Sequence, residues 1–432
     1  MVRMARAIIE TYGCTLNMAD SDMMESVLKS NGMDVERGRY RSGGGHDYVI
    51  VNTCTVKTPT EQRILDRIRR ISAGGAKLIV TGCMASANAD RIIKAAPGAS
   101  IVSTSNVHRI ADAVDDIDRH GRIDYSNYSR GDKLEHARQY GSVVARIPIS
   151  EGCLSSCNFC ETKFARGPLN SFSDRLILKA IGLSVKSGSA EIELTSQDVG
   201  AYGLDRGTNI GELVMGIADI DGDFRVRIGM LNPEHLHKYM DDLIEGYRDR
   251  RIYKFIHLPL QSASNKVLKE MDRRYTIEQF CSYVRELRAK VPGISIETDM
   301  IVGYPTENAA DFSESMEFIR NIRPTFTNVS KFGARPHAKA SELKQLGNLT
   351  IKERSSGMSR LAREVQREDL SRLVGSSCSV LITEENGRSL VGRDDSYRIV
   401  AIDKYGCGAK VGERITAKAY ANTSVCLLGK AN

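Results

Sequence analysis

Three cysteines within one short stretch are the residues of this sequence best suited to chemistry. They are Cys153, Cys157 and Cys160, spaced Cys-x-x-x-Cys-x-x-Cys directly after the apolar run 143–149. Thiolates bind iron and zinc, and four ligands normally complete an iron–sulfur or structural zinc site. A set of three therefore leaves one metal position open for a substrate or cofactor. A zinc knuckle or a chance cluster of cysteines is the alternative interpretation.

A second set of cysteines is dispersed along the first part of the chain. Cys14, Cys54 and Cys83 each follow a predicted strand, in Tyr-Gly-Cys, Asn-Thr-Cys and Thr-Gly-Cys. Parallel strands place their carboxyl ends along one edge of a sheet, where such folds bind ligands, so we expect the three cysteines to meet. They predict a second [4Fe–4S] cluster with an open iron. The alternative is that they are core residues, since free cysteines are often buried.

The elements that would position the dispersed cysteines alternate between strand and helix. The predicted strands are 7–11, 48–51, 77–80 and 100–103. The predicted helices between them include 20–30 and 60–71. This alternation indicates an α/β fold with a doubly wound parallel sheet. We expect this first domain to span residues 1–125 and to be followed by a polar, irregular linker at 126–140.

Strands and helices are again predicted to alternate in the part of the chain that contains the clustered cysteines. The predicted strands are 143–149, 191–195, 225–228, 255–258, 295–302 and 326–331. The predicted helices are 173–187, 234–247, 277–290 and 310–320. Six consecutive units predict a partial (β/α) barrel over residues 140–366, with its active site at the carboxyl ends of the strands.

Polar or small residues at these strand ends are suited to hold a cofactor. Gly303 would allow the backbone to approach a flat ligand such as adenine, and an aromatic ring beside the third cysteine could pack against it. His257, also at a strand end, is interpreted as a structural histidine. The expected cofactor-binding residues are Phe159, Ser196, Gln197, Gln261, Val302 and Gly303.

The carboxyl-terminal part of the chain no longer shows alternating strands and helices. Residues 351–373 read as a helix in which five arginines alternate with acidic residues, which fits either a solvated face or a nucleic-acid face. Beyond it, short strands are predicted at 378–382, 389–391, 397–402 and 414–420. They predict a small β-barrel over residues 367–432, a fold that commonly binds RNA.

Composition narrows the functional class. The chain has 432 residues, of which 41% are hydrophobic and 27% charged, values typical of a soluble globular protein of two or three domains. It contains no apolar run long enough for a membrane span and no signal peptide, so no membrane association is expected. Ten cysteines then indicate metal or redox use in a reducing cytoplasm. A net charge of +7 allows a polyanionic partner.

With both cysteine sets placed, the chain resembles the radical S-adenosylmethionine (SAM) methylthiotransferases over nearly its full length. The matching motifs are Thr11–Asn17, Asn52-Thr53-Cys54, Gly82-Cys83, Ser150–Cys160 and Arg166-Gly167. The carboxyl-terminal β domain is similar to the RNA-binding TRAM module. Cys-Glu-Thr-Lys-Phe-Ala-Arg-Gly at 160–167 and His257–Ser264 resemble the archaeal and eukaryotic branch. One departure is Gly333–Ala338, where relatives usually carry an Arg-Pro-Gly-Thr-type loop.

The resemblance implies two [4Fe–4S] clusters, SAM, a tRNA partner and an external electron donor. In that branch the substrate is N6-threonylcarbamoyladenosine beside the anticodon, modified at C2. The alternatives are a methylthiotransferase acting on isopentenyladenosine or on a ribosomal-protein side chain, and, in another class, a non-catalytic iron–sulfur RNA-binding protein. Threonylcarbamoyladenosine carries a carboxylate, so its pocket should hold a cation. The candidates are Lys163, Arg166 and Arg335, although Lys163 could equally be a plain surface residue.

Overall fold

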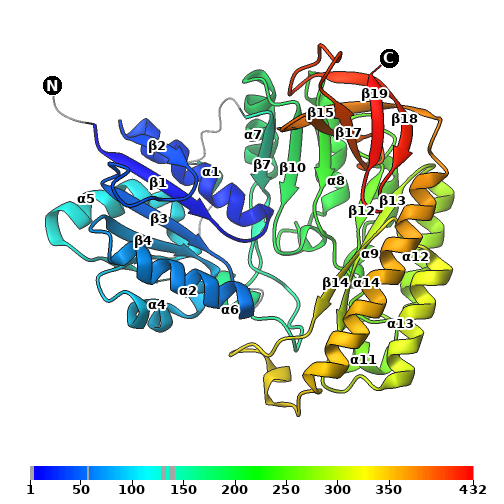
Figure 1. Ribbon diagram of the computed structural model, residues 1–432, viewed down its shortest axis with the longest axis horizontal. Coiled ribbons are helices and arrows are strands. Elements are labelled where there is room, and N and C mark those ends of the chain that lie inside the picture. Colours follow the sequence, from blue (N-terminus) through cyan, green and yellow to red (C-terminus); the bar gives the residue numbers. More distant parts are fainter. Residues whose placement is uncertain (1–3, 56–57, 128–132, 136–141, 432) are drawn as a thin grey trace.

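The computed structural model describes residues 4–55, 58–127, 133–135 and 142–431. Figure 1 shows three parts: an amino-terminal domain in blue and cyan, a central barrel in green and yellow, and a small carboxyl-terminal barrel in red. No helix in the described ranges is long and apolar enough to cross a membrane.

The amino-terminal domain is built on one sheet of six strands, all parallel, in the order β2-β1-β3-β4-β5-β6. The strands are β1 (Arg6–Thr11), β2 (Asp34–Arg37), β3 (Tyr48–Thr53), β4 (Lys77–Gly82), β5 (Ser100–Val102) and β6 (Asp124–Tyr125). The parallel sheet predicted from the sequence is confirmed. The edge strands β2 and β6 were not predicted, because short, polar edge strands lack the apolar run that marks a buried strand.

Helices cover both faces of this sheet, because adjacent apolar residues in each strand point to opposite sides. In β3, Ile50 packs with Leu28 on the side of the helices α1 (Thr15–Ser30) and α5 (Ile110–His120). Val49 packs with Ile64 on the other side, which the helices α2 (Thr58–Ser72), α3 (Cys83–Ala87) and α4 (Ala89–Ala95) cover. Helix α1 begins at residue 15, earlier than the predicted residue 20.

The central barrel contains six parallel strands in two sheets of three, β11-β10-β7 and β12-β13-β14. Isolated parallel bridges, Val226–Ile252 and Met230–His257, connect the two sheets, and one hydrophobic core spans both. The strands are β7 (Val144–Pro148), β10 (Glu191–Thr195), β11 (Arg225–Ile228), β12 (Phe255–His257), β13 (Ser295–Val302) and β14 (Phe326–Lys331). The prediction of a six-unit partial barrel is confirmed.

Beyond the short helix α6 (Thr162–Arg166), the α-helices between these strands are α7 (Asp174–Lys186), α8 (Ile210–Gly216), α9 (Pro233–Leu236), α10 (Met240–Gly246), α11 (Asn265–Glu270), α12 (Ile277–Lys290) and α13 (Ala309–Ile322). The single helix predicted at 234–247 is wrong, because α9 and α10 are separate. Asn232 caps α9, and the chain leaves helical geometry at Tyr239, where φ is −144° and the ring is buried in the core.

Helix α14 (Asn348–Ser371) packs along β14 and leads into the carboxyl-terminal barrel. It is one continuous helix across residues 366 and 367, the expected boundary between the central and carboxyl-terminal domains. The barrel closes in the order β15-β16-β17-β19-β18. Its strands are β15 (Ser377–Asn386), β16 (Ser389–Asp394), β17 (Ile399–Asp403), β18 (Arg414–Asn422) and β19 (Leu427–Ala431). The fifth strand, β19, was not predicted, because it is short and closure of the barrel decides its pairing.

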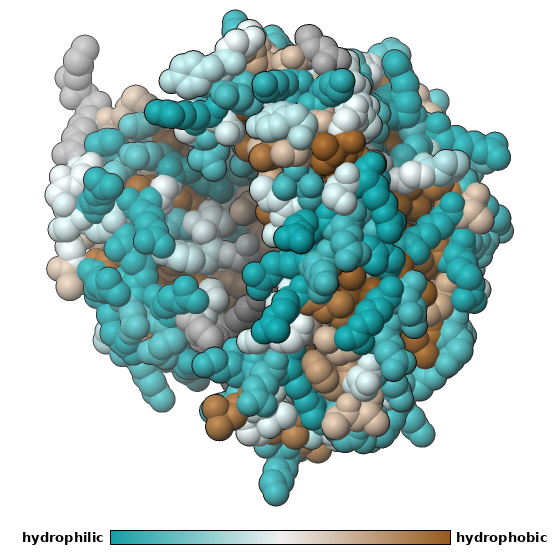
Figure 2. Space-filling view, turned by 45° about the vertical axis from the view of Figure 1, so that its right-hand side comes forward, coloured by the Kyte–Doolittle hydropathy of each residue, from teal (hydrophilic) through white to brown (hydrophobic). Residues whose placement is uncertain are grey.

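The carboxyl-terminal barrel attaches to the amino ends of the central strands. The backbone N–H of Lys254 donates to the carbonyl of Asp395 at 2.8 Å, and the Ser396 hydroxyl donates to the carbonyl of Gly293 at 2.8 Å. The ring of Tyr397 lies 4.8 Å from that of Phe255, measured between centroids. Each of these central residues lies at or just before the start of a strand. The small barrel therefore covers the end of the central barrel opposite to the carboxyl ends of its strands. The face shown in Figure 2 is mainly hydrophilic and is hollowed between the amino-terminal domain and the rest of the molecule.

Candidate functional site

The dispersed cysteines follow the carboxyl ends of three neighbouring strands, β1, β3 and β4. Cys14 is the residue before α1, Cys54 directly follows β3, and Cys83 begins α3. The thiols of Cys14 and Cys83 both contact Oδ1 of Asn17, at 3.5 Å and 3.7 Å. Burial raises the pKa of the Cys83 thiol, and the nearby charges of Cys14 and Cys54 raise this pKa further. The structure thus brings the three cysteines together at one edge of the sheet.

Asn17 and a glycine hold these strand ends close to one another. The side-chain amide of Asn17 donates to the carbonyl of Thr53 at 2.7 Å and to Oδ1 of Asn52 at 3.2 Å. Gly82, before Cys83, has φ +88°, and a Cβ there would lie 2.3 Å from the carbonyl oxygen of Thr53. Only glycine allows this backbone conformation at such a short approach. The Thr-Gly-Cys motif is thereby explained by the contact between β3 and β4.

The clustered cysteines lie in a loop between the two-residue strand β8 (Ser150–Glu151) and α6 (Thr162–Arg166). The backbone N–H of Thr162 donates to the sulfur of Cys160 at 3.4 Å. Nη1 of the buried Arg273 donates to the sulfur of Cys157, also at 3.4 Å. Burial raises the pKa of Cys153 to about 12, and the charges of Asp198 and of the other two cysteines add to this effect. The three sulfurs are thus near neighbours, and two of them accept hydrogen bonds.

Both sets fit a [4Fe–4S] cluster. Each offers three soft sulfur donors, and N–H groups next to the sulfurs are what such clusters use to stabilise their charge. Among the described residues, no three His, Cys, Asp or Glu side chains converge closely enough for a single metal ion. A four-iron cluster is larger than one ion and spreads its ligands more widely.

The two cysteine sets face each other across a buried polar contact. Glu161, which follows Cys160, accepts hydrogen bonds from Thr55 Oγ1 at 2.9 Å and from Asn88 Nδ2 at 2.8 Å. Thr55 follows Cys54 and also contacts Glu61. The carboxylate of Glu61 is in turn paired with Arg91 at 3.0 Å and with Arg335 at 3.4 Å. This contact joins the cysteine loop of the central barrel to the amino-terminal domain.

A cavity of about 300 Å³ opens beside this contact. It is lined by Thr55, Phe159, Cys160, Glu161, Thr162, Gln261, Asp299, Ile301, Ser330, Lys331, Phe332, Gly333 and Arg335. A second, more polar cavity of about 450 Å³ shares Asp299 and Ser330 with it and continues between β14 and α14. One wall of the first cavity is thus a cluster loop, and another is formed by the carboxyl ends of β13 and β14.

Known proteins with the same sequence pattern identify the family. Residues 6–104 match the uncharacterized protein family UPF0004, and residues 147–319 match the radical SAM superfamily. A probable threonylcarbamoyladenosine tRNA methylthiotransferase of Pyrococcus abyssi is 40% identical over 393 residues, covering 90% of this chain and 91% of that protein. The chain belongs to the threonylcarbamoyladenosine tRNA methylthiotransferase family.

Other relatives agree with this assignment. A probable methylthiotransferase of the same name from Archaeoglobus fulgidus is 38% identical over 422 residues, covering 96% of this chain and 95% of that protein. The human enzyme of that name is 30% identical over 412 residues, covering 92% of this chain and 69% of that protein. The resemblance to the archaeal and eukaryotic branch is therefore confirmed.

Solved structures share the fold at low sequence identity. The radical SAM methyltransferase TsrM from Kitasatospora setae is 13% identical with a TM-score of 0.54, covering 79% of this chain and 77% of that chain. The cobalamin-dependent SAM radical enzyme OxsB is 13% identical with a TM-score of 0.55, covering 84% of this chain and 56% of that chain. These similarities concern the fold alone.

The residues of this methylthiotransferase that we expected to bind the cofactor differ in their surroundings. Phe159 and Gln261 line the 300 Å³ cavity, and Gln261 has a left-handed backbone with φ +75°. Such a conformation is costly for a non-glycine residue and is typical of functional positions. Ser196 Oγ and Gln197 Oε1 are buried atoms without a hydrogen-bond partner in the described structure. Val302 lies in the hydrophobic core.

Gly303 has a packing role that the sequence did not indicate. Its φ is +82°, and a Cβ there would lie 2.6 Å from Cγ1 of Ile351 on α14. The absence of a side chain at this position therefore allows helix α14 to pack closely, and the expected contact with a flat ligand stays a prediction.

The three cationic side chains proposed to contact the substrate differ in their burial and in their partners. Lys163 is half-buried and donates to the Leu154 carbonyl at 3.2 Å and to Ser156 Oγ at 3.1 Å. Arg335 is buried against the cavity, and its Nη1 has no hydrogen-bond partner among the described residues beyond its ion pair with Glu61. Arg166 is fully buried in an ion network at the domain contact.

Several residues around the two cysteine sets were given no role by sequence reasoning. Arg273 is far from Cys157 in the sequence and carries no signal of its contact. Asn17 and Glu161 lie inside the motifs that carried the family resemblance, so their positions, though not their partners, could have been noticed. Lys133 falls in the expected irregular linker, yet its ammonium group is buried and ion-paired.

Proposed function

We propose that this methylthiotransferase adds a methylthio group to C2 of N6-threonylcarbamoyladenosine beside the tRNA anticodon, giving 2-methylthio-N6-threonylcarbamoyladenosine. The observation that supports this most directly is the contact between the two cysteine sets through Thr55 and Glu161. A reaction that removes hydrogen from a carbon and then attaches sulfur to it needs both centres at one substrate. The names of the archaeal and human relatives support the same substrate.

The enzyme uses two [4Fe–4S] clusters and SAM. We assign one cluster to Cys153, Cys157 and Cys160 and the other to Cys14, Cys54 and Cys83. When bound, these groups supply what side chains lack, a radical that removes hydrogen from an unactivated aromatic carbon and a methylated sulfur that replaces it. An external electron donor is required, because the radical reaction begins with a one-electron reduction.

The side chains of this protein bind the cofactor, orient the substrate and shield the reaction from water. Phe159 and Gln261, which line the 300 Å³ cavity, are assigned to SAM binding. Ser196 and Gln197, which do not line this cavity but carry buried polar atoms without a hydrogen bond in the described structure, are assigned to the same cofactor. We propose no direct ligand contact for Val302, and for Gly303 only a backbone contact. The position of this cavity at the contact between two domains limits the access of water, which protects a reactive radical from side reactions.

Arg335 is the best suited of the three cations to recognise the threonyl carboxylate. It lines the cavity, it is buried, and its Nη1, which is ion-paired with Glu61 at 3.4 Å, makes no hydrogen bond among the described residues. A charge-assisted hydrogen bond to a carboxylate contributes about 1.5–3 kcal/mol, which corresponds to roughly ten- to hundredfold discrimination against a neutral modification such as isopentenyladenosine. Lys163 is assigned to the RNA backbone near the cluster loop.

An exposed pair of aromatic rings is suited to a nucleotide of the anticodon loop. The rings of Phe164 and His337 are stacked, with centroids 4.8 Å apart and planes 28° apart. Phe164 is 60% exposed, an unusual exposure for a phenylalanine beside a cluster loop. Both rings line a cavity of about 470 Å³ that also contains Lys163 and Lys339. Unpaired bases stack on such rings, and the lysines would contact phosphates.

The carboxyl-terminal barrel is assigned to the stem of the same RNA. It covers the amino ends of the central strands, whereas the cysteine loops lie at the carboxyl ends. A partner that contacts both must be elongated, as an anticodon stem-loop is. A tRNA partner and the abundance of reduced cysteines fit an enzyme of the cytoplasm.

The experiment presents purified, reconstituted enzyme with anticodon stem-loops that carry either threonylcarbamoyladenosine or isopentenyladenosine, and measures the methylthio nucleoside by mass spectrometry. We expect product from the first substrate only. Arg335→Gln should lower kcat/KM roughly ten- to hundredfold on the first substrate, since it removes one charge-assisted hydrogen bond. Lys344→Gln, at an exposed lysine in the following loop, is the matched control. Equal turnover of isopentenyladenosine, or none of threonylcarbamoyladenosine, would contradict the assignment.

A further inference from the structure

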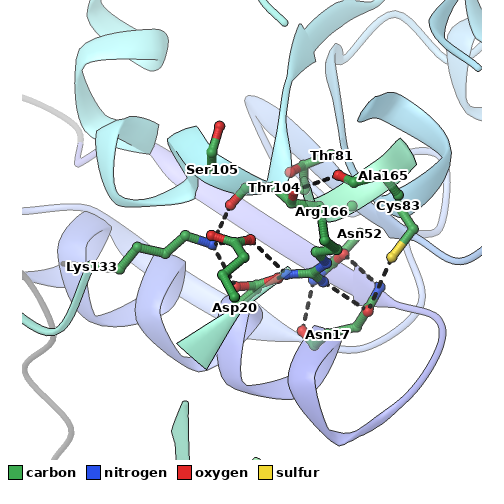
Figure 3. A network of polar contacts seen from close by, with 12 residues as sticks. Asn17, Asp20, Asn52, Thr81, Cys83, Thr104, Ser105, Lys133, Ala165 and Arg166 are labelled. Carbon is green, nitrogen blue, oxygen red and sulfur yellow. Dashed lines mark hydrogen bonds and ion pairs between the residues drawn. The ribbon is translucent and has the colours of Figure 1, made fainter. Parts of the chain in front are cut away.

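Arg166 joins the central barrel to the amino-terminal cysteine site. It is the last residue of α6, six positions after Cys160, and its side chain is fully buried. Figure 3 shows its guanidinium between Asp20 on one side and Asn17 with Cys83 on the other. A residue of the central barrel thus reaches the sulfur ligands of the other domain.

The ion network behind Arg166 contains two cations and two carboxylates. Nη1 of Arg166 lies 2.7 Å from Asp20 Oδ2 and 3.1 Å from Glu151 Oε1. Nζ of Lys133 lies 2.8 Å from the same oxygen of Glu151 and 3.4 Å from Asp20 Oδ1. All four side chains are buried, so each charge depends on its partners. Figure 3 shows Lys133 at the end of this network away from Cys83.

Arg166 is the member of the network that faces the sulfurs. Its Nη2 donates to Asn17 Oδ1 at 3.0 Å, the same oxygen that Cys14 and Cys83 contact. Burial raises the pKa of Cys83 to about 12, while the charge of Arg166 and a hydrogen bond from it act in the opposite direction. Nε of Arg166 is also buried, without a hydrogen-bond partner among the described residues. The cation therefore has an unused donor beside the cysteine site.

We propose that Arg166 is a positioning residue of the amino-terminal cluster, which holds Asn17 and Cys83 in place and raises the reduction potential of that cluster. A positive charge and N–H groups next to the sulfurs stabilise the more negative, reduced state. Because α6 begins two residues after Cys160, the loop that organises the radical site also organises the sulfur-donating site. This inference rests on the proposed function for the presence of the cluster.

Two double variants test it in the full-length chain. Arg166→Gln alone would leave a buried carboxylate unpaired and would destabilise the fold, so each variant also carries Asp20→Asn. Arg166→Gln/Asp20→Asn and Lys133→Gln/Asp20→Asn have the same net charge and each retain one cation with Glu151. They differ in whether that cation faces the sulfurs. Replacing Cys153, Cys157 and Cys160 by Ala in both leaves the amino-terminal cluster as the only one loaded.

The measurement is the midpoint potential of this cluster in an EPR-monitored redox titration. We expect a more negative potential, with changed EPR g values, in the Arg166 variant, and a much smaller shift in the Lys133 variant. Retention of the cluster by the Lys133 variant and its loss by the Arg166 variant would also support the proposal. Equal potentials in the two variants, or loss of the cluster from both, would overturn it.

A single substitution keeps the proposal testable if the Arg166 double variant does not fold. Arg166→Lys retains the charge but not the forked donor to Asn17, so it should shift the potential in the same direction by a smaller amount. An unchanged potential and EPR signal in a folded Arg166→Lys protein would overturn the proposal. If the parent with an intact Arg166 binds no iron at Cys14, Cys54 and Cys83, the proposed function itself fails, and the parent shows this before any change at Arg166.

Discussion

The hydroxyl of Thr55 donates a 2.9 Å hydrogen bond to Oε2 of Glu161, although 106 positions separate the two residues. Thr55 directly follows Cys54, and Glu161 directly follows Cys160. Both side chains are buried. This hydrogen bond joins the two cysteine loops directly, in a contact that neither domain can make alone.

Thr55→Val should uncouple the two centres. The substitution keeps the shape of the side chain but removes the one O–H donor that the carboxylates of Glu161 and Glu61 share. The free energy of unfolding should fall by about 1–3 kcal/mol, the cost of an unsatisfied buried polar group. We expect formation of 5′-deoxyadenosine to continue and the yield of methylthio product per 5′-deoxyadenosine to fall.

The control for this variant is Thr208→Val. Thr208 Oγ1 also donates to a carboxylate, that of Glu212 at 2.6 Å, but at the exposed start of α8. Its effect on stability should stay within about 0.5 kcal/mol, as for most surface substitutions. An unchanged product ratio in Thr55→Val would show that the hydrogen bond does not align the two sites.

Metal analysis should separate the two cysteine sets. Anaerobic reconstitution of the wild type should load about eight irons per chain, because each cluster holds four. Replacing Cys153, Cys157 and Cys160 by Ala should halve this content and abolish SAM cleavage. Replacing Cys14, Cys54 and Cys83 should halve it as well, but SAM cleavage should persist while methylthio product disappears. Normal product from the second variant would make those cysteines structural.

Two lysines on the carboxyl-terminal barrel should carry part of the RNA affinity. Lys418 and Lys430 are cross-strand partners on β18 and β19, and Lys430 lies 5.5 Å from the centre of the exposed ring of Tyr420. If each lysine neutralises one phosphate, changing both to Gln should lower the slope of log K against log salt by about 1.4–1.8. The matched control changes Lys29 and Lys94, exposed lysines of the amino-terminal domain, to Gln. Equal slopes in both proteins would place the RNA site elsewhere, for example on α14.

His257 should make the stability of the protein depend on pH. Burial by itself would lower the pKa of His257, but the hydrogen bond to Asp299 at 2.9 Å and the charges of Glu297 and Asp299 outweigh it, so the pKa is raised. A raised pKa in the folded state means that the stabilisation is complete below the unfolded pKa of about 6.5 and is lost as pH rises through the folded value.

The measurement is urea unfolding of the wild type and of His257→Gln at pH 6 and pH 9. The stability difference between the two proteins should be larger at pH 6. Asp299→Asn removes one of the charges that stabilise the imidazolium. This variant should therefore also lose more stability at pH 6 than at pH 9. A difference that is the same at both pH values would contradict this interpretation.

The sequence by itself determined the fold class, the family and the presence of two cysteine sets. Apolar strands that alternate with helices lead to parallel sheets whatever the details of packing, and cysteines directly after such strands must lie at one edge. This explains why the placement of Cys14, Cys54 and Cys83 could be predicted from strand ends alone. It also explains why short edge strands such as β2 and β6, which lack an apolar run, escaped prediction.

Only the tertiary structure decided what surrounds those cysteines. The partners of Cys157, Cys83 and Cys160 are Arg273, Arg166 and Thr162, and the first two are brought in by contacts between distant segments. Gly303 is a further example of a contact that the local sequence does not reveal. Its lack of a side chain makes room for Ile351 of helix α14, which lies far along the chain. Local sequence specifies whether a residue can be buried, charged or left-handed. Which buried charge it meets depends on how whole elements pack, because a lone buried ion is too costly to keep and its partner can come from any part of the chain.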